Sequence, residues 1–453
     1  MSLKAYRYRL YPTDAQKVDF ARHFGCTRLV FNKYIEAAEA HYKEKKTFLS
    51  AFTFNTTGLM ELKKENPFLS ERINSQSLQS AVLNGAAAYK NFFAGHARRP
   101  CFKKKSDGRQ SFQCPQNVKV LFPEKDGKKT GTIRLPVIKD VKAKLHRRFE
   151  GKVKTVTIIR EPSGKYYASV LVDDAAELPL PDVITPELTV GMDAGLKTAF
   201  TVGNSTGTAK IDNPKFLQKH AKEIAKRQKI LARKQFTLKE ITTKEGKTVT
   251  VKVPSQGRVK ARQALARAYE KVRFCRQNWI HTVTRLIVDK NQATTIVIED
   301  LNLRGMMKNL QLARAVSDVG IGNFYRVLEY KLRDAGKNLV RAGRWYPSSR
   351  LCPHCGYKNT ELTLKDRQWE CPVCGCQHDR DEAAAVNLSR WPALSEEEQR
   401  RYGRNDRALN AGKSAGVKRS PRELTVGAGS LAKGSAAVIS RNESCEVREI
   451  TRG

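Results

Sequence analysis

Two cysteine pairs toward the C-terminal end of the chain have the spacing of a metal site. Each pair is a CxxC motif followed by glycine, fifteen residues separate the pairs, and the cysteines are Cys352, Cys355, Cys371 and Cys374. Two residues between cysteines let both thiolates bind one ion, and two such pairs complete a closed tetrahedral site. The spacing therefore predicts one structural Zn2+ ion that orders the chain without catalysis, with His354 and Cys376 outside its coordination shell.

Acidic residues at the ends of apolar segments form a second, dispersed candidate site. Asp193 follows the apolar run LTVGM and is flanked by Gly191 and Gly195, and Glu299 follows the run TTIVI. Singly, such an acid is more simply a turn former or a helix N-cap. With a third acid, carboxylates from separate strands could bridge two metal ions about 3.5–4 Å apart, an arrangement that hydrolyses phosphodiesters.

Three more acids follow the second cysteine pair closely. They lie in the stretch CPVCGCQHDRDEAAAVNLSR, residues 371–390, at Asp379, Asp381 and Glu382. The alanines after them predict a helix, for which Asp379 is a suitable N-cap and on which Glu382 would be solvated. These residues alone leave open whether one of the acids holds a metal.

Basic residues dominate the charge of the chain. It has 84 Lys and Arg residues against 45 Asp and Glu residues, which gives a formal net charge of +39. Such an excess repels itself in a compact protein unless a polyanion offsets it. No apolar run approaches the ~18–20 residues that span a bilayer, so no membrane partner is expected. Nucleic acid is the expected polyanion, and the alternative is a basic but inert surface.

The distribution of cysteines indicates the redox compartment. Five of the ten lie between Cys352 and Cys376, and the others are scattered singly. This is unlike a disulfide framework and favours a reducing cytoplasm with one metal site. The N-terminal MSLKAYRYRLYP has no apolar signal-peptide segment. We expect a cytoplasmic, nucleoid-associated protein that acts as a monomer.

The N-terminal elements change from helical to extended spacing. Residues 13–108 are expected to form a helical domain, because apolar residues recur at helical spacing through segments such as SQSLQSAVLNGAAAYKNFF. Residues 1–12 and 109–180 are expected to form a small β-barrel, since GTIRLPVI, VKTVTII and YYASVLV are rich in β-branched and aromatic residues. The proline-rich stretch DAAELPLPDVITPEL then marks a domain boundary.

The C-terminal half alternates strands with long basic helices, so the chain is expected to be an α/β multidomain protein. Strands are predicted in LTVGMDAGLKTAFTV, TTIVIEDLNL and NLVRAGRW. Two helices within residues 215–290 repeat apolar residues every seven positions and predict an antiparallel pair, with a seam of Leu217, Ile224, Leu231, Leu265, Val272, Trp279 and Leu286. Their charges are almost all positive, which favours a nucleic-acid track. Residues 394–453 are expected to be a disordered basic tail.

Several segments, taken in order, resemble one known family. GMDAGLKTAFTV, IVIEDLNL, the paired CxxC motifs and HDRDEAAAVNL follow the order and spacing of the RuvC-like nuclease of TnpB (OrfB) proteins. KAYRYRLYPTDAQ, FGCTRLVFNKYIE and KNFFAGHARRPCFKKK resemble that family's opening segments. The resemblance implies a transposon-encoded, RNA-guided DNA endonuclease related to miniature type V CRISPR effectors. It implies as partners a guide RNA and double-stranded target DNA with a short adjacent motif, both strands of which are cut with two Mg2+ ions.

The resemblance also assigns roles to the acids. Asp193 matches the first catalytic aspartate, Glu299 the catalytic glutamate and Asp381 the third acid, so all three are implied as catalytic residues and Mg2+ ligands. Their presence argues against the relatives that act only as guided repressors. The family's asparagine two positions after the third acid is Ala383 here. This difference removes outer support for Asp381 but no metal ligand.

The domains implied by the resemblance cover residues 1–180 and 187–453. They are a wedge β-barrel (1–12 and 109–180), a helical recognition domain (13–108), a RuvC-like nuclease domain of RNase H fold (187–349, with a helical insertion at 215–290), a zinc ribbon inserted at 350–377, the end of the nuclease at 378–393, and the tail at 394–453.

Candidate nucleic-acid contacts are of three kinds. Amide and guanidinium side chains at helical spacing could read base edges in a groove: Gln76 with Gln79, and Arg28 with Asn32. A lysine run could neutralise phosphates: Lys103, Lys104 and Lys105. Cations near the acids or on the basic helices could contact the backbone: Lys197, Arg273 and Arg304. Ordinary surface polarity is the alternative for each.

Other functions remain open at this point. A miniature CRISPR effector would carry the same residues with a separately encoded guide. A guide-directed DNA-binding protein that does not cut would leave the acids incidental. A strand-joining transposase is disfavoured because no Tyr or Ser recombinase nucleophile motif is present.

Overall fold

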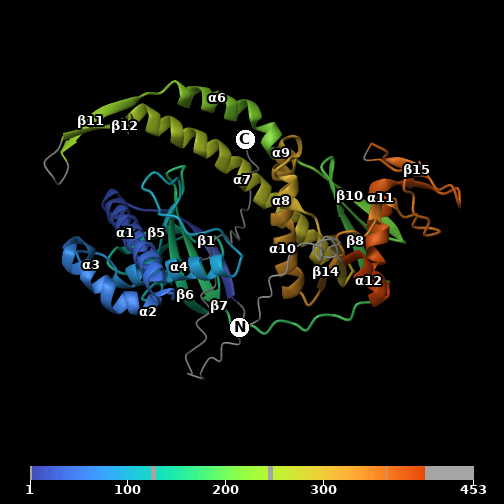
Figure 1. The fold of residues 1–453 in the computed structure, drawn as a ribbon, viewed down its shortest axis with the longest axis horizontal. Helices are drawn as coiled ribbons and strands as arrows, with labels where there is room; N and C mark the ends of the chain where they lie inside the picture. Colours follow the sequence, from blue (N-terminus) through green and yellow to red (C-terminus); the bar gives the residue numbers. More distant parts are fainter. Residues whose placement is uncertain (1–2, 124–128, 243–247, 364, 404–453) are drawn as a thin grey trace. The chain divides into compact units, whose positions relative to one another are not determined.

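The structure is a computed structural model that describes residues 3–123, 129–242, 248–363 and 365–403 (Figure 1). Its contacts divide the chain into two compact units. The first comprises Met1–Glu177 and Glu223–Lys271, and the second comprises Leu178–Lys222 and the described chain from Val272 onward. No helix among these described residues is long and apolar enough to cross a membrane.

One antiparallel sheet forms the base of the first unit. Its strands, in the order in which they pair, are β2 (Gln110–Cys114), β6 (Lys152–Arg160), β7 (Tyr166–Asp173), β1 (Leu3–Tyr11), β5 (Lys139–Lys144), β4 (Thr130–Leu135) and β3 (Lys119–Leu121). The expected antiparallel strands, with β1 joined to β7 and β5, are confirmed. Because the described pairing ends at β2 and β3, the closed barrel stays a prediction.

The helices of the first unit pack around two long members, α1 (Asp14–Lys45) and α4 (Ser75–Phe93). α1 begins at a capping box, since the Thr13 side chain and the N3 residue exchange hydrogen bonds with each other's backbone. A Cβ atom at Gly85 would lie 2.4 Å from the Tyr34 ring, so this glycine allows the two helices to approach. Shorter turns connect them: α2 (Ala51–Thr53), a π-helical turn (Phe54–Gly58), α3 (Leu59–Glu65) and a 3-10 turn (Pro67–Leu69).

The segment expected to be two basic helices contains a further hairpin. Its elements are α5 (Phe216–Lys219), α6 (Ala221–Ala232), β11 (Phe236–Thr242), β12 (Thr248–Pro254) and α7 (Gln256–Lys290). The antiparallel pairing is confirmed, because Gln228 Nε2 donates to Tyr269 Oη at 3.0 Å and Arg258 Nη1 donates to the Leu231 carbonyl at 3.2 Å. The seam prediction is wrong at Leu286, which is 53% exposed. The β11–β12 hairpin was not predicted, although TVTVKVP alternates as a strand does.

A mixed five-stranded sheet organises the second unit. The order is β10 (Gly207–Asp212), β9 (Thr198–Asn204), β8 (Thr189–Ala194), β13 (Thr295–Glu299) and β14 (Asn338–Ala342). β10, β9 and β8 form an antiparallel meander, whereas β13 runs parallel to both β8 and β14. The strands predicted in this half are confirmed, and the architecture is mixed α/β.

Helices cover both faces of this sheet. On one face, α7 and α10 (Ile321–Asp334) contribute to a core that includes Met192 and Ile298. On the other, α11 (Arg380–Ser389) packs through Leu388 against Val297. Because successive side chains of a strand alternate between faces, Asp193 and Glu299 lie on the α11 face. α8 (Leu303–Met306) and α9 (Leu310–Val319) lie in the connection between β13 and α10.

A small cysteine-bearing ribbon precedes α11. β15 (Gln368–Glu370) pairs with β16 (Gln377–Asp379), and α11 begins at the next residue. After α11 comes α12 (Glu396–Gly403), from which Tyr402 packs edge-on against Tyr346 with ring centroids 5.3 Å apart. The expectation of a disordered tail is therefore wrong for 396–403, since this aromatic contact gives the segment a core to pack against. Residues 404–453 lie outside the described residues.

Candidate functional site

Two neighbouring parallel strands place the first two acids. Ile298 of β13 is opposite Met192 of β8, and the next residue of each strand is Glu299 and Asp193, respectively. A Cβ atom at Gly191 would lie 2.0 Å from the Ala385 carbonyl oxygen, so only glycine at that position lets α11 lie against β8. Gly191, two residues before Asp193, thus allows the helix that carries the third acid to lie on the same face.

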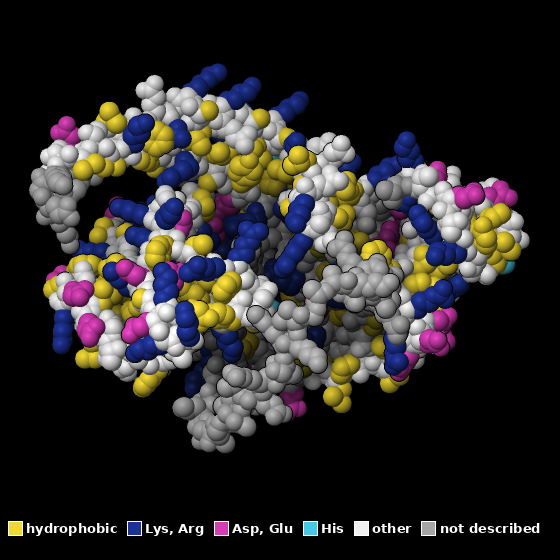
Figure 2. Space-filling model, viewed as in Figure 1, with side chains coloured by type: hydrophobic (Ala, Val, Ile, Leu, Met, Phe, Trp, Pro, Cys, Tyr) yellow, Lys and Arg dark blue, Asp and Glu magenta, His cyan; other side chains and the backbone are white. Residues whose placement is uncertain are grey.

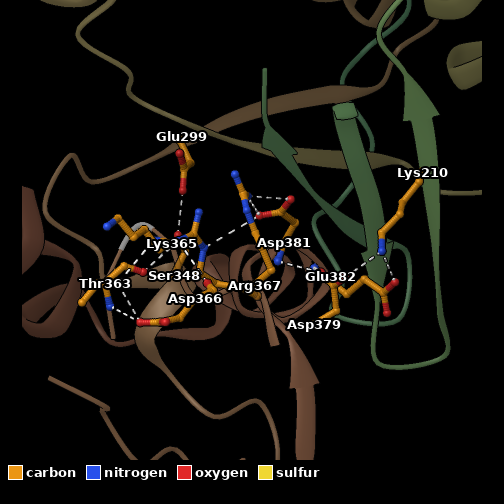
Figure 3. A network of polar contacts seen from close by, with 11 residues as sticks. Lys210, Glu299, Ser348, Thr363, Lys365, Asp366, Arg367, Asp379, Asp381 and Glu382 are labelled. Carbon is orange, nitrogen blue, oxygen red and sulfur yellow. Dashed lines mark hydrogen bonds and ion pairs between the residues drawn. The ribbon is translucent and has the colours of Figure 1, made fainter. Parts of the chain in front are cut away.

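The first turn of α11 supplies Asp381. The carboxylate of Asp379 accepts hydrogen bonds from the backbone N–H groups of Asp381 at 2.9 Å and Glu382 at 3.2 Å, which confirms it as the N-cap. Glu382, which was expected to be solvated, is 40% exposed at its side chain and also pairs with Lys210 of β10 at 2.7 Å. The same lysine binds Asp379 at 2.8 Å and ties the start of α11 to the sheet (Figure 3).

The ionisation of Asp193 and of Glu299 is shifted by their surroundings. Burial raises the pKa of Asp193 well above its usual value, and the negative charges of Glu299 and Asp381 raise it further, against a lowering by Arg380. Burial also raises the pKa of Glu299, while a hydrogen bond from Ser348 lowers it. The acids thus lie where little water solvates their ionised form, and a bound divalent cation would stabilise that form.

A serine missed in the sequence orients Glu299. Ser348 Oγ donates to Glu299 Oε1 at 2.6 Å. Asn387 of α11 fixes the serine, because its buried amide donates to the carbonyls of Ser348 and Leu351, each at 2.8 Å. The available signal was an asparagine at the end of the alanine run AAAVNL, on an otherwise apolar helix.

The position that differs from the family pattern lies inside the helix packing. Ala383 is 3% exposed, and the two alanines after it are equally buried in α11. A methyl group here contributes packing but no hydrogen bond to Asp381. The sequence itself shows that the family's asparagine is absent at position 383, and the loss of support for Asp381 stays a prediction.

An arginine that the sequence did not single out contacts Asp381. Arg367, the residue before β15, donates from Nη1 to Asp381 Oδ1 at 3.1 Å and Oδ2 at 3.3 Å (Figure 3). Arg380 approaches the same carboxylate, with Nε 3.8 Å from Oδ1. The third acid is thus held by cationic side chains, while Glu299 is held by a hydroxyl.

The four predicted cysteines converge. The Sγ atoms of Cys352, Cys355, Cys371 and Cys374 all lie within 4.8 Å of one another. Each pair has the same turn: the N–H groups of Gly356 and Gly375 donate to the carbonyls of Cys352 and Cys371 at 2.9 and 2.8 Å. Both glycines have a positive φ, 76° and 66°, which a side chain would disfavour. Four converging thiols are the donor set of a closed structural zinc site.

Further metal-donating groups surround the four cysteines. His354 and Cys376, placed outside the coordination shell by the sequence, lie with Cys374 in a second group of donors within 4.8 Å. His378 Nε2 is 3.1 Å from Cys352 Sγ, in the position of an outer hydrogen-bond partner. In the described chain, the acids Asp193, Glu299 and Asp381 do not converge as closely as either of these groups.

In the first unit, several predicted nucleic-acid contacts have structural partners. The Asn32 amide exchanges two hydrogen bonds with the backbone of Lys103, at 2.8 and 2.9 Å, and the Lys103 ammonium lies 3.8 Å from the centre of the Phe31 ring. Gln76 Nε2 donates to Gln116 at 2.9 Å. Asn32 therefore has partners within the protein at both its oxygen and its nitrogen, and its reading of base edges stays a prediction.

The remaining predicted contacts differ in exposure. Four are exposed: Gln79, Lys104, Lys105 and Lys197. Arg304 is also exposed, on the short helix α8, whereas Arg28 is half-buried. Arg273 is half-buried and its guanidinium lies 5.2 Å from the centre of the Phe274 ring. On the face shown in Figure 2, Lys and Arg side chains outnumber acidic ones, including over α6. Their role in nucleic-acid binding stays a prediction.

Three family models match different parts of the chain. Residues 322–388 match the Cas12f1-like TNB domain, residues 168–310 match the OrfB family of IS605 elements, described as "Probable transposase", and residues 1–47 match the helix-turn-helix domain of the same OrfB proteins. Together with the mixed α/β unit and its four-cysteine ribbon, these matches place the chain in the class of OrfB-like proteins with a TNB domain.

Two whole proteins agree with the models. A protein of Streptomyces pristinaespiralis named as an RNA-guided DNA endonuclease is 34% identical over 388 residues, which cover 85% of this chain and 88% of that protein. InsQ of Escherichia coli K12, which is also named as an RNA-guided DNA endonuclease, is 27% identical over 404 residues. These residues cover 85% of this chain and 91% of InsQ. A solved mini-RNA-guided endonuclease, CRISPR-Cas_phi3, aligns over 87% of this chain and 92% of that chain with 9% identity and a TM-score of 0.49. The chain belongs to the TnpB (OrfB) family.

Proposed function

We propose that the chain is an RNA-guided DNA endonuclease that cuts both strands of a target by metal-dependent phosphodiester hydrolysis in its second unit. Membership of the TnpB family supports the guide RNA and the DNA target, because the relatives at 34% and 27% identity carry that activity in their names. The net charge of +39 supports a polyanionic partner.

The observation that carries the nuclease assignment is the position of the acids. Asp193 and Glu299 follow paired residues of adjacent parallel strands, and Asp381 comes from the helix packed on the same face. The strand order β10-β9-β8-β13-β14, three antiparallel strands followed by two parallel ones, supports a RuvC-like nuclease of RNase H fold. Metal-dependent hydrolysis needs carboxylates of this kind from separate elements.

The donor set fits divalent cations. Carboxylate oxygens are the ligands that Mg2+ prefers, and Asp193, Glu299 and Asp381 supply them at a site where burial and the charges of the other two acids raise the pKa of Asp193. Bound Mg2+ would supply an activated water and stabilise the leaving oxygen. Ser348 would keep the Glu299 carboxylate in one orientation, and the hydrophobic packing of α11 would keep Asp381 on the correct face of the sheet.

The ribbon has a separate role in this proposal. One Zn2+ held by its four cysteines would fix β15 and β16, which lead directly into Asp379 and Asp381. The zinc would therefore order the segment that delivers the third acid and would take no part in the chemistry.

The test is cleavage by the purified ribonucleoprotein. We expect the chain expressed with its flanking DNA to co-purify with a defined RNA, and sequencing that RNA gives the guide. Linear DNA that matches the guide and carries a randomised adjacent motif should be cut with Mg2+ and left intact with EDTA. Guide-dependent DNA binding without any cut product under these conditions would favour a DNA-binding protein that does not cleave.

A further inference from the structure

A second group of metal donors shares one cysteine with the four-cysteine site. This second donor group comprises His354, Cys374 and Cys376, whose donor atoms all lie within 4.8 Å of one another. Among the residues that the structure describes, the four CxxC cysteines are the other group of three or more His, Cys, Asp and Glu side chains that converges this closely. Since Cys374 alone belongs to both groups, His354 and Cys376 are donors that the four-cysteine site does not use.

The four-cysteine site needs no further ligand. Cys352 Sγ is 3.6 Å from Cys374 Sγ, and Cys355 Sγ is 3.5 Å from Cys371 Sγ. Bonds of about 2.3 Å from one zinc ion to its sulfur ligands, at tetrahedral angles, place two such sulfurs about 3.8 Å apart. The four thiols therefore already have the spacing of ligands to a single ion, and the two remaining donors are available to another one.

The second donor group has the composition of an open zinc site. An imidazole and two thiolates favour Zn2+ and similar thiophilic cations, whereas Mg2+ favours oxygen ligands. Three protein ligands leave the fourth position of a tetrahedral ion to water. The exposures agree with this, because His354 is exposed and both Cys374 and Cys376 are half-buried. A cation from solution can therefore reach these donors while the ribbon is folded.

The turn at Gly375 brings the two cysteines of the second donor group together. Gly375 has a positive φ of 66°, and the Cys371 N–H donates to the Cys376 carbonyl at 2.9 Å. Cys376 thus lies beside the second CxxC motif, and β16 begins at the next residue. His354 comes from the first CxxC motif. An ion bound to the second donor group would therefore link the two motifs a second time.

We propose that His354, Cys374 and Cys376 form a second, open metal site that binds one thiophilic divalent cation of the Zn2+ class, with the Cys374 thiolate shared between two ions. This site binds its ion more weakly than the four-cysteine site, because it has only three protein ligands and one of them already holds an ion. Its occupation stabilises the ribbon by joining the two CxxC motifs. The proposal goes beyond the nuclease function and does not depend on it.

The first test uses Co2+ as the probe, added to the full-length chain after one zinc per chain has been verified by elemental mass spectrometry. Tetrahedral Co2+ with thiolate ligands absorbs strongly in the visible region, whereas Co2+ bound octahedrally to oxygen ligands of RNA or carboxylates absorbs weakly. We expect the tetrahedral bands to rise until about one Co2+ is bound per chain, with the zinc content unchanged. A wild-type chain without these bands would overturn the site. Bands that rise only as zinc is lost would also overturn it, because Co2+ would then occupy the four-cysteine site.

Two variants and a matched control assign the ligands. His354→Ala and Cys376→Ser should each keep one zinc and bind Co2+ at least about tenfold more weakly, since even the loss of a group that merely supports a metal ligand costs that much. Cys101→Ser removes an exposed cysteine outside both groups and should bind Co2+ as the wild type does. Wild-type Co2+ binding in either ligand variant would overturn the assignment. Loss of the zinc in Cys376→Ser would also overturn it, because this cysteine would then be a ligand of the first ion.

The second test follows thermal stability. A cation that binds the folded ribbon more tightly than the unfolded chain raises the melting temperature. Excess Zn2+ should raise the melting temperature of the zinc-loaded wild type and of Cys101→Ser by about 2–4 °C, and should leave that of His354→Ala unchanged. An equal rise in His354→Ala, or no rise in the wild type, would overturn stabilisation of the ribbon through this site. Because neither test measures cleavage, both remain decisive for a chain that cuts no DNA.

Discussion

The zinc ribbon and the acid site use metal-binding residues in opposite ways. The four cysteines lie within 23 residues of sequence, their Sγ atoms converge within 4.8 Å, and two glycine turns set their geometry locally. The three acids come from two strands and a helix, repel one another, and are offset by arginines. The proposed zinc site is built from residues close together in the sequence, whereas the proposed nuclease site depends on the whole second unit to hold its acids together.

The largest effect should come from removing an acid. Asp193→Asn should lower the cleavage rate by at least about 10³-fold, because a ligand and its charge are lost at the reacting atoms. Its zinc content should remain that of the wild type. The measurement is the rate of guide-dependent cutting at saturating Mg2+.

The matched control is Asp300→Asn. Asp300 follows Glu299 in the chain but pairs with Arg344 and is 41% exposed at its side chain. This variant should cut at the wild-type rate. If Asp193→Asn and Asp300→Asn lose activity equally, cleavage depends on the total negative charge at this edge of the sheet. The three predicted carboxylates would then have no special role.

The next effect should come from the ribbon. Cys371→Ser should remove bound zinc and lower both thermal stability and cleavage, the latter by about 10–100-fold, because supporting structure around a metal ligand is lost. Cys376→Ser should keep its zinc if the four CxxC cysteines form the coordination shell. The zinc content of both variants is measured by elemental mass spectrometry. A Cys371→Ser chain that is folded and active without bound zinc would refute the structural role.

The sequence predicted the local features of both sites. The CxxC spacing predicted which cysteines converge, and the acids at the ends of apolar runs predicted two strand ends. Both patterns depend only on residues that lie close together in the sequence. Asp379 was recognised as a cap for the same reason. The family resemblance then selected Asp381 among three nearby acids.

The partners of these residues could not be read from the sequence. Arg367 and Ser348 act on Asp381 and Glu299 across loops, and nothing in their own neighbourhoods distinguishes them from ordinary polar residues. Asn387 stands out as a polar residue after an apolar run, but the sequence does not show which groups it contacts. The hydrogen bonds of Asn32 could not be predicted either, because they go to Lys103, 71 positions away in the sequence. Charge and amide patterns show where a polar group is, and only the fold determines what it contacts.

A smaller effect should come from the hydroxyl that orients Glu299. Ser348→Ala removes the hydrogen bond that lowers the Glu299 pKa, so the pKa of this acid should rise further. The low-pH limb of the cleavage profile should then move to higher pH, with a rate loss of about fivefold at neutral pH, the equivalent of one lost hydrogen bond. Ser349→Ala changes the neighbouring serine and should leave the profile unchanged. An identical profile in Ser348→Ala would show that this contact does not orient the acid.

The smallest effect concerns the charge repulsion itself. Because the pKa of Asp193 is raised in the folded chain, the folded state binds more protons than the unfolded state between the usual aspartate value and the raised one. The free energy of unfolding of the metal-free protein should therefore fall as pH rises through that window, by at most about 1.4 kcal/mol per pH unit for one proton. Asp193→Asn should flatten this slope, and Mg2+ should flatten it in the wild type by compensating the same charge. Melting curves recorded across the acidic range measure the slope. If the unfolding free energy of Asp193→Asn and of the wild type changes equally with pH, repulsion among the acids does not lower stability in the absence of a cation. The acid site would then not differ from the cysteine ribbon in this respect.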